Sequence, residues 1–560
     1  RGDNHRAGGD FKTSRVTGRI GHELPLDEVG STAYQSRNHQ LNLGWQDGVH
    51  RVEARVKVQD MPYQLYPNQR MDLLDNQMER VSLRYLGDMA WGQLEARLHH
   101  ETVDHFMDFG PDKRLWYGNG APPTGSGGPM AANGSPCSPV GTATCARGMP
   151  MITESQTTGA RVQAAMPWAD LGTLRAGAEW QVHHLDDWWP PSGAGMSPGT
   201  FENIHDGRRE RLGTYAELDT QPSPDWQVLA GVRVDRIRMQ ADTVQGYNPA
   251  GMGNQGRDAA LFNARDRQRT DHHLGLSLLA RHQHSAQVDL DIGLARQTRS
   301  PSLYEAYPWS TWQMAALMNN TVGDGNGYIG NPDLKPETAH TLSTTLDWHS
   351  TDRQRWIKLS PYITHISHYI DAVQWDSTSN APRTALLRDQ FTTLRYANQS
   401  ARLQGLDVSW HTGLGRNDWG QWAFSGQISH VRGTNRSTGD GLYQLMPLNA
   451  KLALQHRHGA WQGSIEGVAV AAKRRVSSVR NEISTPGYAL LNLRGSHHWK
   501  HVRLDVGIDN VFDRLYALPQ GGVYVGQGTT MTTTGTSSPR WGTAVPGAGR
   551  SLYANITMAF

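Results

Sequence analysis

The chain has 560 residues, of which 37% are hydrophobic, and its mean hydropathy is -0.60. No run comes near the roughly 18 consecutive apolar residues of a membrane-spanning helix, so a helical membrane protein is excluded. Lys and Arg number 54 against 52 Asp and Glu, and no basic block marks a nucleic-acid surface, so we expect no nucleic-acid partner. The 60 Gly and 19 Trp are typical of a turn-rich β-protein with an aromatic surface.

The chain begins at Arg1 without a methionine, and no charged and apolar secretion leader follows. We therefore expect that a leader has been removed or that the protein continues upstream. From about Thr32 onward, strand-like segments are separated by connections that alternate between short and long, beginning with the tight turn Gln46–Val49 and the long stretch from Met61 to about Asn76.

The same rhythm continues to the end of the chain. Further long connections are expected near residues 106–150, 184–207, 241–267, 300–334, 375–392 and 515–545. Short turns on one rim and long loops on the other are typical of outer-membrane barrels, in which the long loops face the outside. A soluble β-sandwich is not expected to keep this asymmetry.

Two cysteines lie in the first of these long connections. Cys137 and Cys145 are flanked by Gly, Ser and Pro, which favours a disulfide that pins the loop in an oxidising compartment. The alternative, a pair of thiolate metal ligands, lacks the second Cys pair of a typical zinc site.

Apolar residues recur with a period of two, which is the signature of a wall with one apolar and one wet face. Val288, Leu290, Ile292 and Leu294 alternate with Gln287, Asp289, Asp291 and Gly293, and Val502, Leu504, Val506 and Ile508 alternate with Arg503, Asp505, Gly507 and Asp509. These patterns predict an all-β fold, a transmembrane antiparallel β-barrel.

About nineteen strands are counted from Thr32 to the end, whereas a bacterial single-chain barrel has an even number. Three more strands would make 22, so residues 1–31 are interpreted as the remnant of an early strand and loop, and residues 32–560 as the barrel domain. The last segment, Ser551–Phe560, places Leu552, Ala554, Ile556, Met558 and Phe560 on one face. It resembles an outer-membrane assembly signal that ends at Phe560.

Four segments resemble TonB-dependent receptors, namely Arg299–Tyr307, Gly330–Glu337, Ala397–Asp407 and Asn510–Tyr516. The resemblance implies the 22-strand receptor barrel, present as a monomer in the outer membrane of a Gram-negative cell. It also implies an N-terminal plug and a TonB box that would precede residue 1. The Pro residues restrict the backbone where a loop returns to a strand, which is a structural role. The residues that carry the pattern are Asn331, Pro332, Lys335, Pro336, Glu337, Asn510, Phe512, Asp513 and Tyr516.

A narrower resemblance is to TonB-dependent copper receptors. It is carried by His105–Asp108, by Met149–Gly159, and by the run from Ala517 to Tyr553. It implies import of copper, driven by TonB with ExbB and ExbD through the plug. Other expected partners are outer-membrane lipid, lipopolysaccharide and the barrel assembly machinery. No cofactor is expected, because copper would be the transported ligand.

Copper(I) is soft and prefers thioether, thiolate and imidazole ligands, so Met and His residues near the long loops are the candidate ligands. The set comprises Met149, Met151, His183, His184, Met196 and Met314, the last together with Met318 in the same loop, and Met61, Met71 and Met107 are weaker members. Each could instead be structural, since Met commonly fills gaps and a lone His on a strand is usually solvated or hydrogen-bonded.

The remaining alternatives are a receptor for a siderophore or other metal chelate, a passive porin, and an enzyme. Asp186, Asp187, Glu154 and Asp108 could be imagined as paired carboxylates for hydrolysis, but no Ser, His and acid arrangement supports them. We therefore expect no enzyme activity. Trp188, Trp189 and Trp348 are assigned to aromatic girdles or to loop packing.

Overall fold

The computed structural model describes residues 1–9, 11, 24–113, 116–118, 145–147, 149–191, 199–248, 254–527 and 542–559. Across these ranges no helix has the length and apolar character needed to cross a membrane. Cys137, Met196 and Phe560 lie outside the described residues, as does the side chain of Cys145, so the predicted disulfide and the terminal Phe stay predictions.

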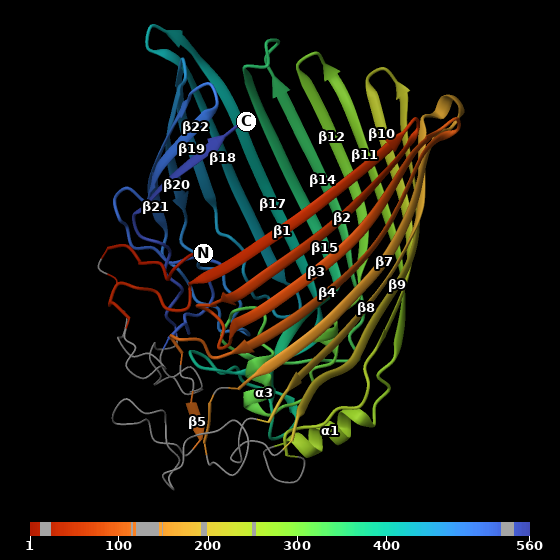
Figure 1. Ribbon diagram of the computed structural model, residues 1–560, viewed down its shortest axis with the longest axis vertical. Coiled ribbons are helices and arrows are strands. Elements are labelled where there is room, and N and C mark those ends of the chain that lie inside the picture. Colours follow the sequence, from red (N-terminus) through yellow and green to blue (C-terminus); the bar gives the residue numbers. More distant parts are fainter. Residues whose placement is uncertain are drawn as a thin grey trace.

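One antiparallel wall contains nearly all the strands (Figure 1). In the described part of the chain this sheet has 21 strands, of which β13 (Gly327–Ile329) and β16 (Ala381–Pro382) are short additions, leaving nineteen long ones. Each long strand pairs with the next along the sequence. The predicted antiparallel barrel and its count of about nineteen strands are confirmed.

The long strands in chain order are β1 (Tyr34–Asp47), β2 (His50–Gln64), β3 (Asp72–Met89), β4 (Gly92–Asp108), β7 (Met151–Pro167), β8 (Thr173–Trp189), β9 (Phe201–Ser223), β10 (Trp226–Gln240), β11 (Arg269–Ser285), β12 (Val288–Arg299), β14 (Glu337–His349), β15 (Arg355–Asp376), β17 (Thr393–Asn417), β18 (Gly420–Asn435), β19 (Asn449–His458), β20 (Trp461–Val470), β21 (Tyr488–His498), β22 (Val502–Asp509) and β23 (Ser551–Met558). Shorter elements are β5 (Trp116–Gly118), β6 (Cys145–Arg147), the 3-10 turn η1 (Ala169–Leu171), α1 (Gln255–Asn263), α2 (Leu303–Ala306) and α3 (Gln313–Met318).

The register explains the sidedness of the wall. Leu278, Leu294, Leu342 and Ile363 are in register across β11, β12, β14 and β15, and all four are well exposed on the outside. The intervening residues point to the lumen, where charges pair, as Arg281 does with Asp291 at 2.7 Å. The period of two therefore separates lipid-facing aliphatic side chains from a polar lumen.

The connections alternate as predicted, with tight turns at one rim and long loops at the other (Figure 1). Sequence reasoning missed the long connections 436–448 and 471–487. Exposed tryptophans lie in or beside the tight turns, and they form an aromatic girdle at that rim: Trp45, Trp91, Trp168, Trp226, Trp348, Trp419, Trp461 and Trp499. The interpretation of Trp348 as a girdle residue agrees with this placement.

The long loops fold back over the ends of the strands and pack there. Helices α1, α2 and α3 contribute apolar residues to one buried cluster with the long-loop ends of β7, β8, β9 and β10. Trp189 stacks on Phe201 with ring centroids 4.2 Å apart, and Phe201 stacks on Trp309 at 4.9 Å. This cluster covers part of the long-loop end of the barrel.

The first residues join the two edge strands at the long-loop rim. Ala7 forms a bridge with Ala548, next to β23, and Gly2 forms one with Tyr34, the first residue of β1. Within the described residues β1 and β23 have no strand on their outer edges. They start near one another and diverge toward the short turns, where the C-terminal end lies (Figure 1).

Buried ionic contacts reinforce this junction, which we call the rim clasp and define as residues 1–9 with their partners in 24–34 and 546–549. Asn4 donates to Asp112 at 2.8 Å, and Ser31 donates its backbone N–H to the same carboxylate. Nearby, fully buried Lys113 contacts Asp72 at 2.5 Å. Burial lowers the pKa of Lys113, and the adjacent Asp72 carboxylate opposes that shift.

Candidate functional site

Three soft donors lie on the lumen side at the long-loop ends of β4 and β7. His105 and Met107 are two residues apart on β4, so they leave the sheet on the same face. Met151, on β7, is the direct cross-strand partner of Met107. His105 is held by a 3.0 Å hydrogen bond from its Nδ1 to Asn76 Oδ1, so its other ring nitrogen can face a ligand.

Asp108 holds together the two chain segments next to Met107 and Met151. Its Oδ1 accepts hydrogen bonds from the backbone N–H groups of Phe109 and Met149, each at 2.7 Å. These two bonds join the end of β4 to the start of β7 across the connection 109–150. Met149 is fully buried beside Met151, so the pair predicted from their spacing is brought together.

The buried carboxylate of Asp187 lies in the next strand. Thr153, opposite His105 on β7, is also the direct partner of Asp187 on β8. Asp187 accepts hydrogen bonds from Asn203 Nδ2 at 2.8 Å, from the Tyr304 hydroxyl at 2.9 Å and from Trp189 Nε1 at 3.0 Å. Among the described residues no Lys or Arg pairs with it, so its charge is solvated only by neutral donors.

Tyr304 belongs to α2, a helix of the long loop 300–336 that packs against the strand ends. Burial, and then the negative charge of Asp187, raise the pKa of the Tyr304 phenol well above its usual value. The phenol therefore stays protonated and keeps donating to the carboxylate. Asp187 was considered in the sequence only as a catalytic acid; nothing there indicated that Tyr304, Asn203 and Trp189 meet it.

Several methionines belong to the apolar cluster that contains Met107 and Met151. Within the described residues, one apolar cluster contains seven of them, five buried and two partly buried: Met71, Met149, Met151, Met239, Met318, Met107 and Met314. Thioethers are soft, polarisable donors that also pack well against aromatic rings. Three of the predicted ligands, Met149, Met151 and Met314, therefore belong to one apolar cluster.

The two predicted histidines do not join them. His183 and His184 are consecutive on β8 and point to opposite faces. His183 bonds to Thr157 at 2.9 Å, about 20 Å along β7 from Met151. His184 lies 3.8 Å from Asp206 on the outside. Likewise Asp186 and Asp187 face opposite sides, so they do not form a carboxylate pair.

In the described part of the chain, no cluster of three or more His, Cys, Asp or Glu residues has the geometry of a metal site. Met61 lies on β2 opposite Asn76, and it is outside the apolar cluster.

The first resemblance motif organises the loop that carries Tyr304. Arg299 binds Glu305 at 2.7 Å and Glu337 at 2.8 Å, and Ser302 forms a capping box with Glu305 at the start of α2. Asn331 donates to the backbone of Tyr396 at 3.0 Å. The contacts of Arg299, Glu337 and Asn331 thus tie the loop ends to β14 and β17.

The second motif shapes the last connection. Asn510 has a positive φ of 51° and bonds to the backbone of Arg514 through both its amide oxygen and its amide nitrogen. Asp513 accepts the backbone N–H of Arg550 at 2.8 Å, and Tyr516 packs on Tyr488 at 4.6 Å. Phe512 is exposed on the surface. In the turn before β14, Lys335 is exposed and the prolines at 332 and 336 are half-buried.

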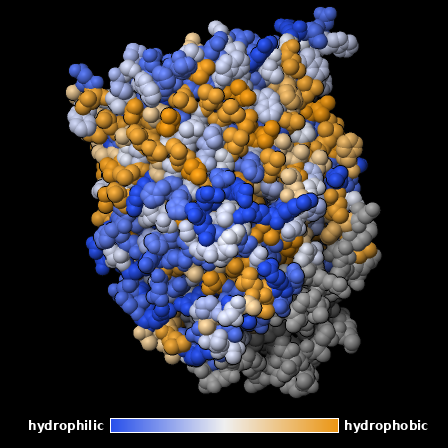
Figure 2. All heavy atoms as spheres, turned by 180° about the vertical axis from the view of Figure 1, so that it is seen from behind, coloured by the Kyte–Doolittle hydropathy of each residue, from blue (hydrophilic) through white to orange (hydrophobic). Residues whose placement is uncertain are grey.

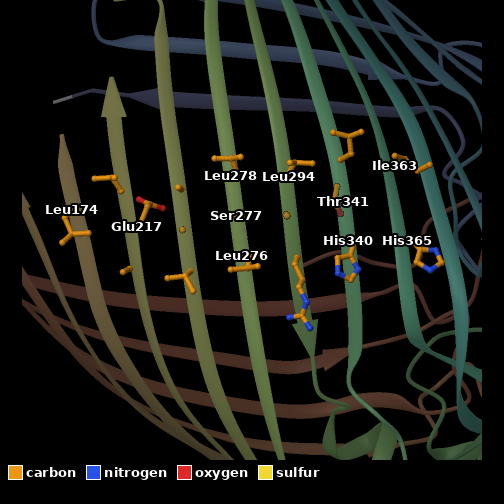
Figure 3. Close-up of a pocket in the computed structure, with 18 of the residues that line it drawn as sticks. Leu174, Glu217, Leu276, Ser277, Leu278, Leu294, His340, Thr341, Ile363 and His365 are labelled. Carbon is orange, nitrogen blue, oxygen red and sulfur yellow. The ribbon is translucent and has the colours of Figure 1, made fainter. Parts of the chain in front are cut away.

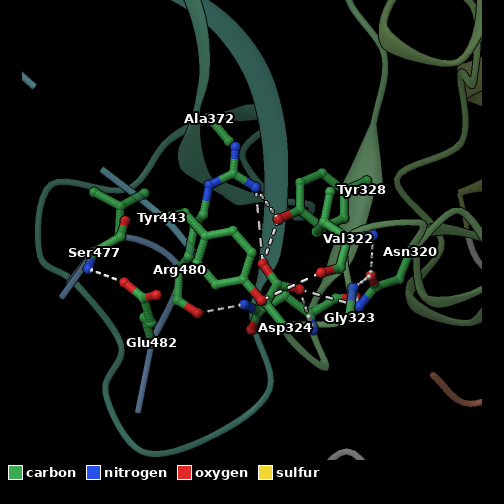
Figure 4. A network of polar contacts seen from close by, with 12 residues as sticks. Asn320, Val322, Gly323, Asp324, Tyr328, Ala372, Tyr443, Ser477, Arg480 and Glu482 are labelled. Atoms are coloured by element: carbon green, nitrogen blue, oxygen red, sulfur yellow. Dashed lines mark hydrogen bonds and ion pairs between the residues drawn. The ribbon is translucent and has the colours of Figure 1, made fainter. Parts of the chain in front are cut away.

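A buried polar network locks the long loops together (Figure 4). Arg480 binds Asp371 at 2.9 Å, lies 3.8 Å from Asp324, and donates to the Tyr328 hydroxyl, which in turn donates to Asp324. Burial raises the pKa of Asp324, whereas Arg480 opposes that rise. Sequence reasoning missed this network, because no local pattern relates positions 324, 371 and 480.

A family model described as TonB dependent receptor-like, beta-barrel, matches residues 9–511. The chain belongs to the TonB-dependent receptor family. This family comprises receptors and transporters of the Gram-negative outer membrane, which confirms the resemblance found in the motifs at 299–337 and 510–516. An outer-membrane location also agrees with the lipid-facing and lumen-facing sides of the wall.

Relatives differ in the cargo that their names state. Heme/hemopexin utilization protein C of Haemophilus influenzae is 23% identical over 247 residues, which cover 39% of this chain and 32% of that protein. The match thus spans about a third of that relative's length. The structure of the copper transporter OprC has a TM-score of 0.70 and 17% identity, and the match covers 98% of this chain and 77% of that one.

Other solved receptors share the fold. The siderophore receptor PirA from Pseudomonas aeruginosa has a TM-score of 0.56 and 12% identity, over 94% of this chain and 71% of that one. The hemophore receptor HasR of Serratia marcescens has a TM-score of 0.61 and 14% identity, over 98% and 74%. At such identities these likenesses show the fold alone.

Proposed function

We propose that this protein imports copper across the outer membrane, with energy supplied by TonB, ExbB and ExbD acting on a plug domain. The observation that carries the proposal is the cross-strand pair Met107 and Met151, with His105 on the same face. Thioether and imidazole groups are donor types that copper(I) prefers. Thioethers are less suited to zinc and to alkaline-earth ions.

The charge balance supports a cation at this place. Burying a charged carboxylate without a cationic partner costs roughly several kcal/mol of folding free energy, even when neutral donors bind it. Asp187 is in that state one strand away from the donors. A monovalent copper ion held by neutral thioether and imidazole ligands would offset the charge, since those ligands contribute none.

The tight packing favours a bare ion over a chelate. Met149 and Met151 are buried among aromatic and aliphatic side chains, as is Trp189. A siderophore or heme would have to displace several of these side chains, whereas an ion needs only the space between donors. Heme or siderophore import, suggested by the names of the relatives, is the alternative cargo.

Binding is tested with the full-length protein and copper(I) in the presence of a chromophoric competitor and a reductant. We expect one copper(I) per protein, bound more tightly than zinc(II), and an affinity that falls at least about tenfold in the double variant Met107→Leu, Met151→Leu. Met558→Leu, on the lipid-facing side of β23, is the matched control. Tight heme or ferric-chelate binding with no copper preference would replace copper as the cargo.

Energy coupling is tested in cells that carry the full-length gene. Copper accumulation should require an intact TonB and should saturate with copper concentration. Accumulation that is independent of TonB and linear in concentration would instead support a passive porin.

A further inference from the structure

The outside of the wall from β10 to β18 has an uneven distribution of charge. We consider the part of each long strand that runs from its tight turn to the level of Arg296, His340, His365 and Arg402. No outward-facing residue in this part is Asp or Glu. The acidic residues of these strands point to the lumen, as Asp291 and Asp347 do, and there they pair with Arg281 and Lys358. The outer surface of this region therefore carries apolar, neutral polar and basic side chains but no acidic ones.

Four basic side chains lie in one row across four adjacent strands. Arg296 on β12 is the direct partner of His340 on β14, His340 of His365 on β15, and His365 of Arg402 on β17. We call these four residues the basic row. Adjacent strands are about 4.8 Å apart, so the row extends over roughly 14 Å.

The basic row faces away from the lumen. It lies two residues along the strands from Leu294, Leu342 and Ile363, which are 49%, 44% and 42% exposed on the lipid-facing side. Seen from behind, apolar side chains gather toward the short turns and hydrophilic ones toward the long loops (Figure 2). The row therefore lies on the long-loop side of the apolar zone.

Three of these four side chains have no partner among the residues that the structure describes. Arg402, His340 and His365 are exposed and form no hydrogen bond or ion pair with any described residue. Arg296 donates to the backbone of Leu274 and to Thr298. Arg432 on β18, diagonal to Arg402 and opposite Gln404, is also exposed, and it too has no partner within the described ranges.

An apolar groove of about 780 Å³ lies directly beside the row (Figure 3). Leu276, Leu278, Leu294, Leu342 and Ile363 line it, with His340 and His365 at one end. Glu217 also borders the groove, but its side chain lies on the lumen face, opposite to the side chains of Ala216 and Leu218. Its carboxylate binds Arg175 there at 3.1 Å. The groove thus combines an apolar floor with guanidinium and imidazole donors at one end.

We propose that the basic row and this groove bind a phosphorylated glycolipid of the outer leaflet, with its phosphates on Arg296 and Arg402 and an acyl chain on the leucines. Guanidinium groups bind phosphate in a bidentate manner, and imidazole N–H groups add donors between them. Long loops mark the outer side of such barrels, so the row lies at the depth of the outer-leaflet head groups. The inference rests on the outer-membrane location and is independent of the cargo.

The test uses the full-length protein, delipidated in detergent and titrated with diphosphoryl lipid A while native mass spectrometry counts bound lipid. Arg402→Gln should weaken binding about tenfold, which is the size expected for one charge-assisted contact. Arg402→Lys should lose less. Arg355→Gln, an exposed arginine on the outward face of the same wall near the tight turns, is the matched control and should bind normally.

Several results would overturn the inference. Equal binding of fully dephosphorylated lipid A, or equal weakening by Arg355→Gln, would leave no role for the row. Complete competition by inorganic phosphate would reduce the site to a free-phosphate site, and dimers that displace the lipid would make the face a contact between two copies. Heat-modifiable migration on gels checks that each variant is folded, and unchanged copper(I) affinity in Arg402→Gln separates this site from the proposed cargo site.

Discussion

Met107 on β4 and Met151 on β7 are direct cross-strand partners, and both side chains leave the sheet on the lumen side. Directly opposite residues of an antiparallel pair have Cβ atoms about 5 Å apart, so two thioethers can reach one ion without backbone movement. Replacing either Met by Leu conserves volume and costs less than about 1.5 kcal/mol of stability. We expect Met107→Leu alone to weaken copper(I) binding about tenfold with unchanged thermal unfolding, measured by competition titration and by calorimetry.

The same substitution at Met558, which is exposed on the lipid-facing side of β23, is the control. If Met107→Leu binds copper(I) as the unmodified protein does, the pair is packing and the donor set lies elsewhere.

Removing the charge of Asp187 should separate electrostatics from packing. Asp187→Asn keeps the size of the side chain but deletes a buried charge that no cation balances among the described residues. We therefore expect weaker copper(I) binding together with an unchanged or higher unfolding temperature. Asp186→Asn, one residue earlier and on the opposite face, should change neither quantity. A drop in stability without any loss of copper(I) affinity would show that Asp187 only organises Tyr304 and Asn203.

Arg480 should hold the long loops in place. Its side chain is 7% exposed and binds Asp371 and Tyr328, with Asp324 close by (Figure 4). Arg480→Gln leaves buried carboxylates unpaired, which costs about 3–5 kcal/mol. We expect faster hydrogen exchange in residues 320–328 and 473–485, while the strands β2 and β3 remain protected.

Arg353→Gln, in the exposed turn between β14 and β15, tests whether loss of any arginine has this effect. Protection of residues 320–328 that is unaltered by Arg480→Gln would contradict the assigned role of the network.

The rim clasp should loosen in acid. Burial lowers the pKa of His5 from its usual 6.5, and its Nε2 lies 3.2 Å from the carbonyl of Pro546. His5 takes up a proton more readily when residues 1–9 are detached than when they are bound in the clasp. The clasp is therefore fully stable at a pH above the usual His pKa of 6.5, and it loses stability as the pH falls below that value. Exchange of residues 1–9, corrected for its intrinsic rate, should be faster at about pH 5 than at about pH 7.5.

His5→Gln removes the titrating group and should make this exchange independent of pH over the same interval. A pH response that persists in the variant would assign the effect to another group of the clasp.

The sequence alone determined the wall. A period of two along Val288–Leu294 places lipid-facing and lumen-facing residues without any knowledge of the neighbouring strands, because side chains of a strand alternate by geometry. The alternation of short and long connections likewise reveals which rim is which. The same local patterns allowed the strands to be counted as nineteen, and motifs such as Asn510–Tyr516 identified the family.

Only the tertiary structure decided which side chains meet. Asp187 acquires Tyr304 and Asn203 as partners, and Arg480 reaches Asp324, because loops that are far apart in sequence fold over the same end of the barrel. The basic row exists only once the register of four strands is set, since a shift of two residues would keep Arg296 and His340 on the outer face but separate them. Local sequence fixes the face of each residue, whereas hydrogen bonding between strands fixes its neighbours.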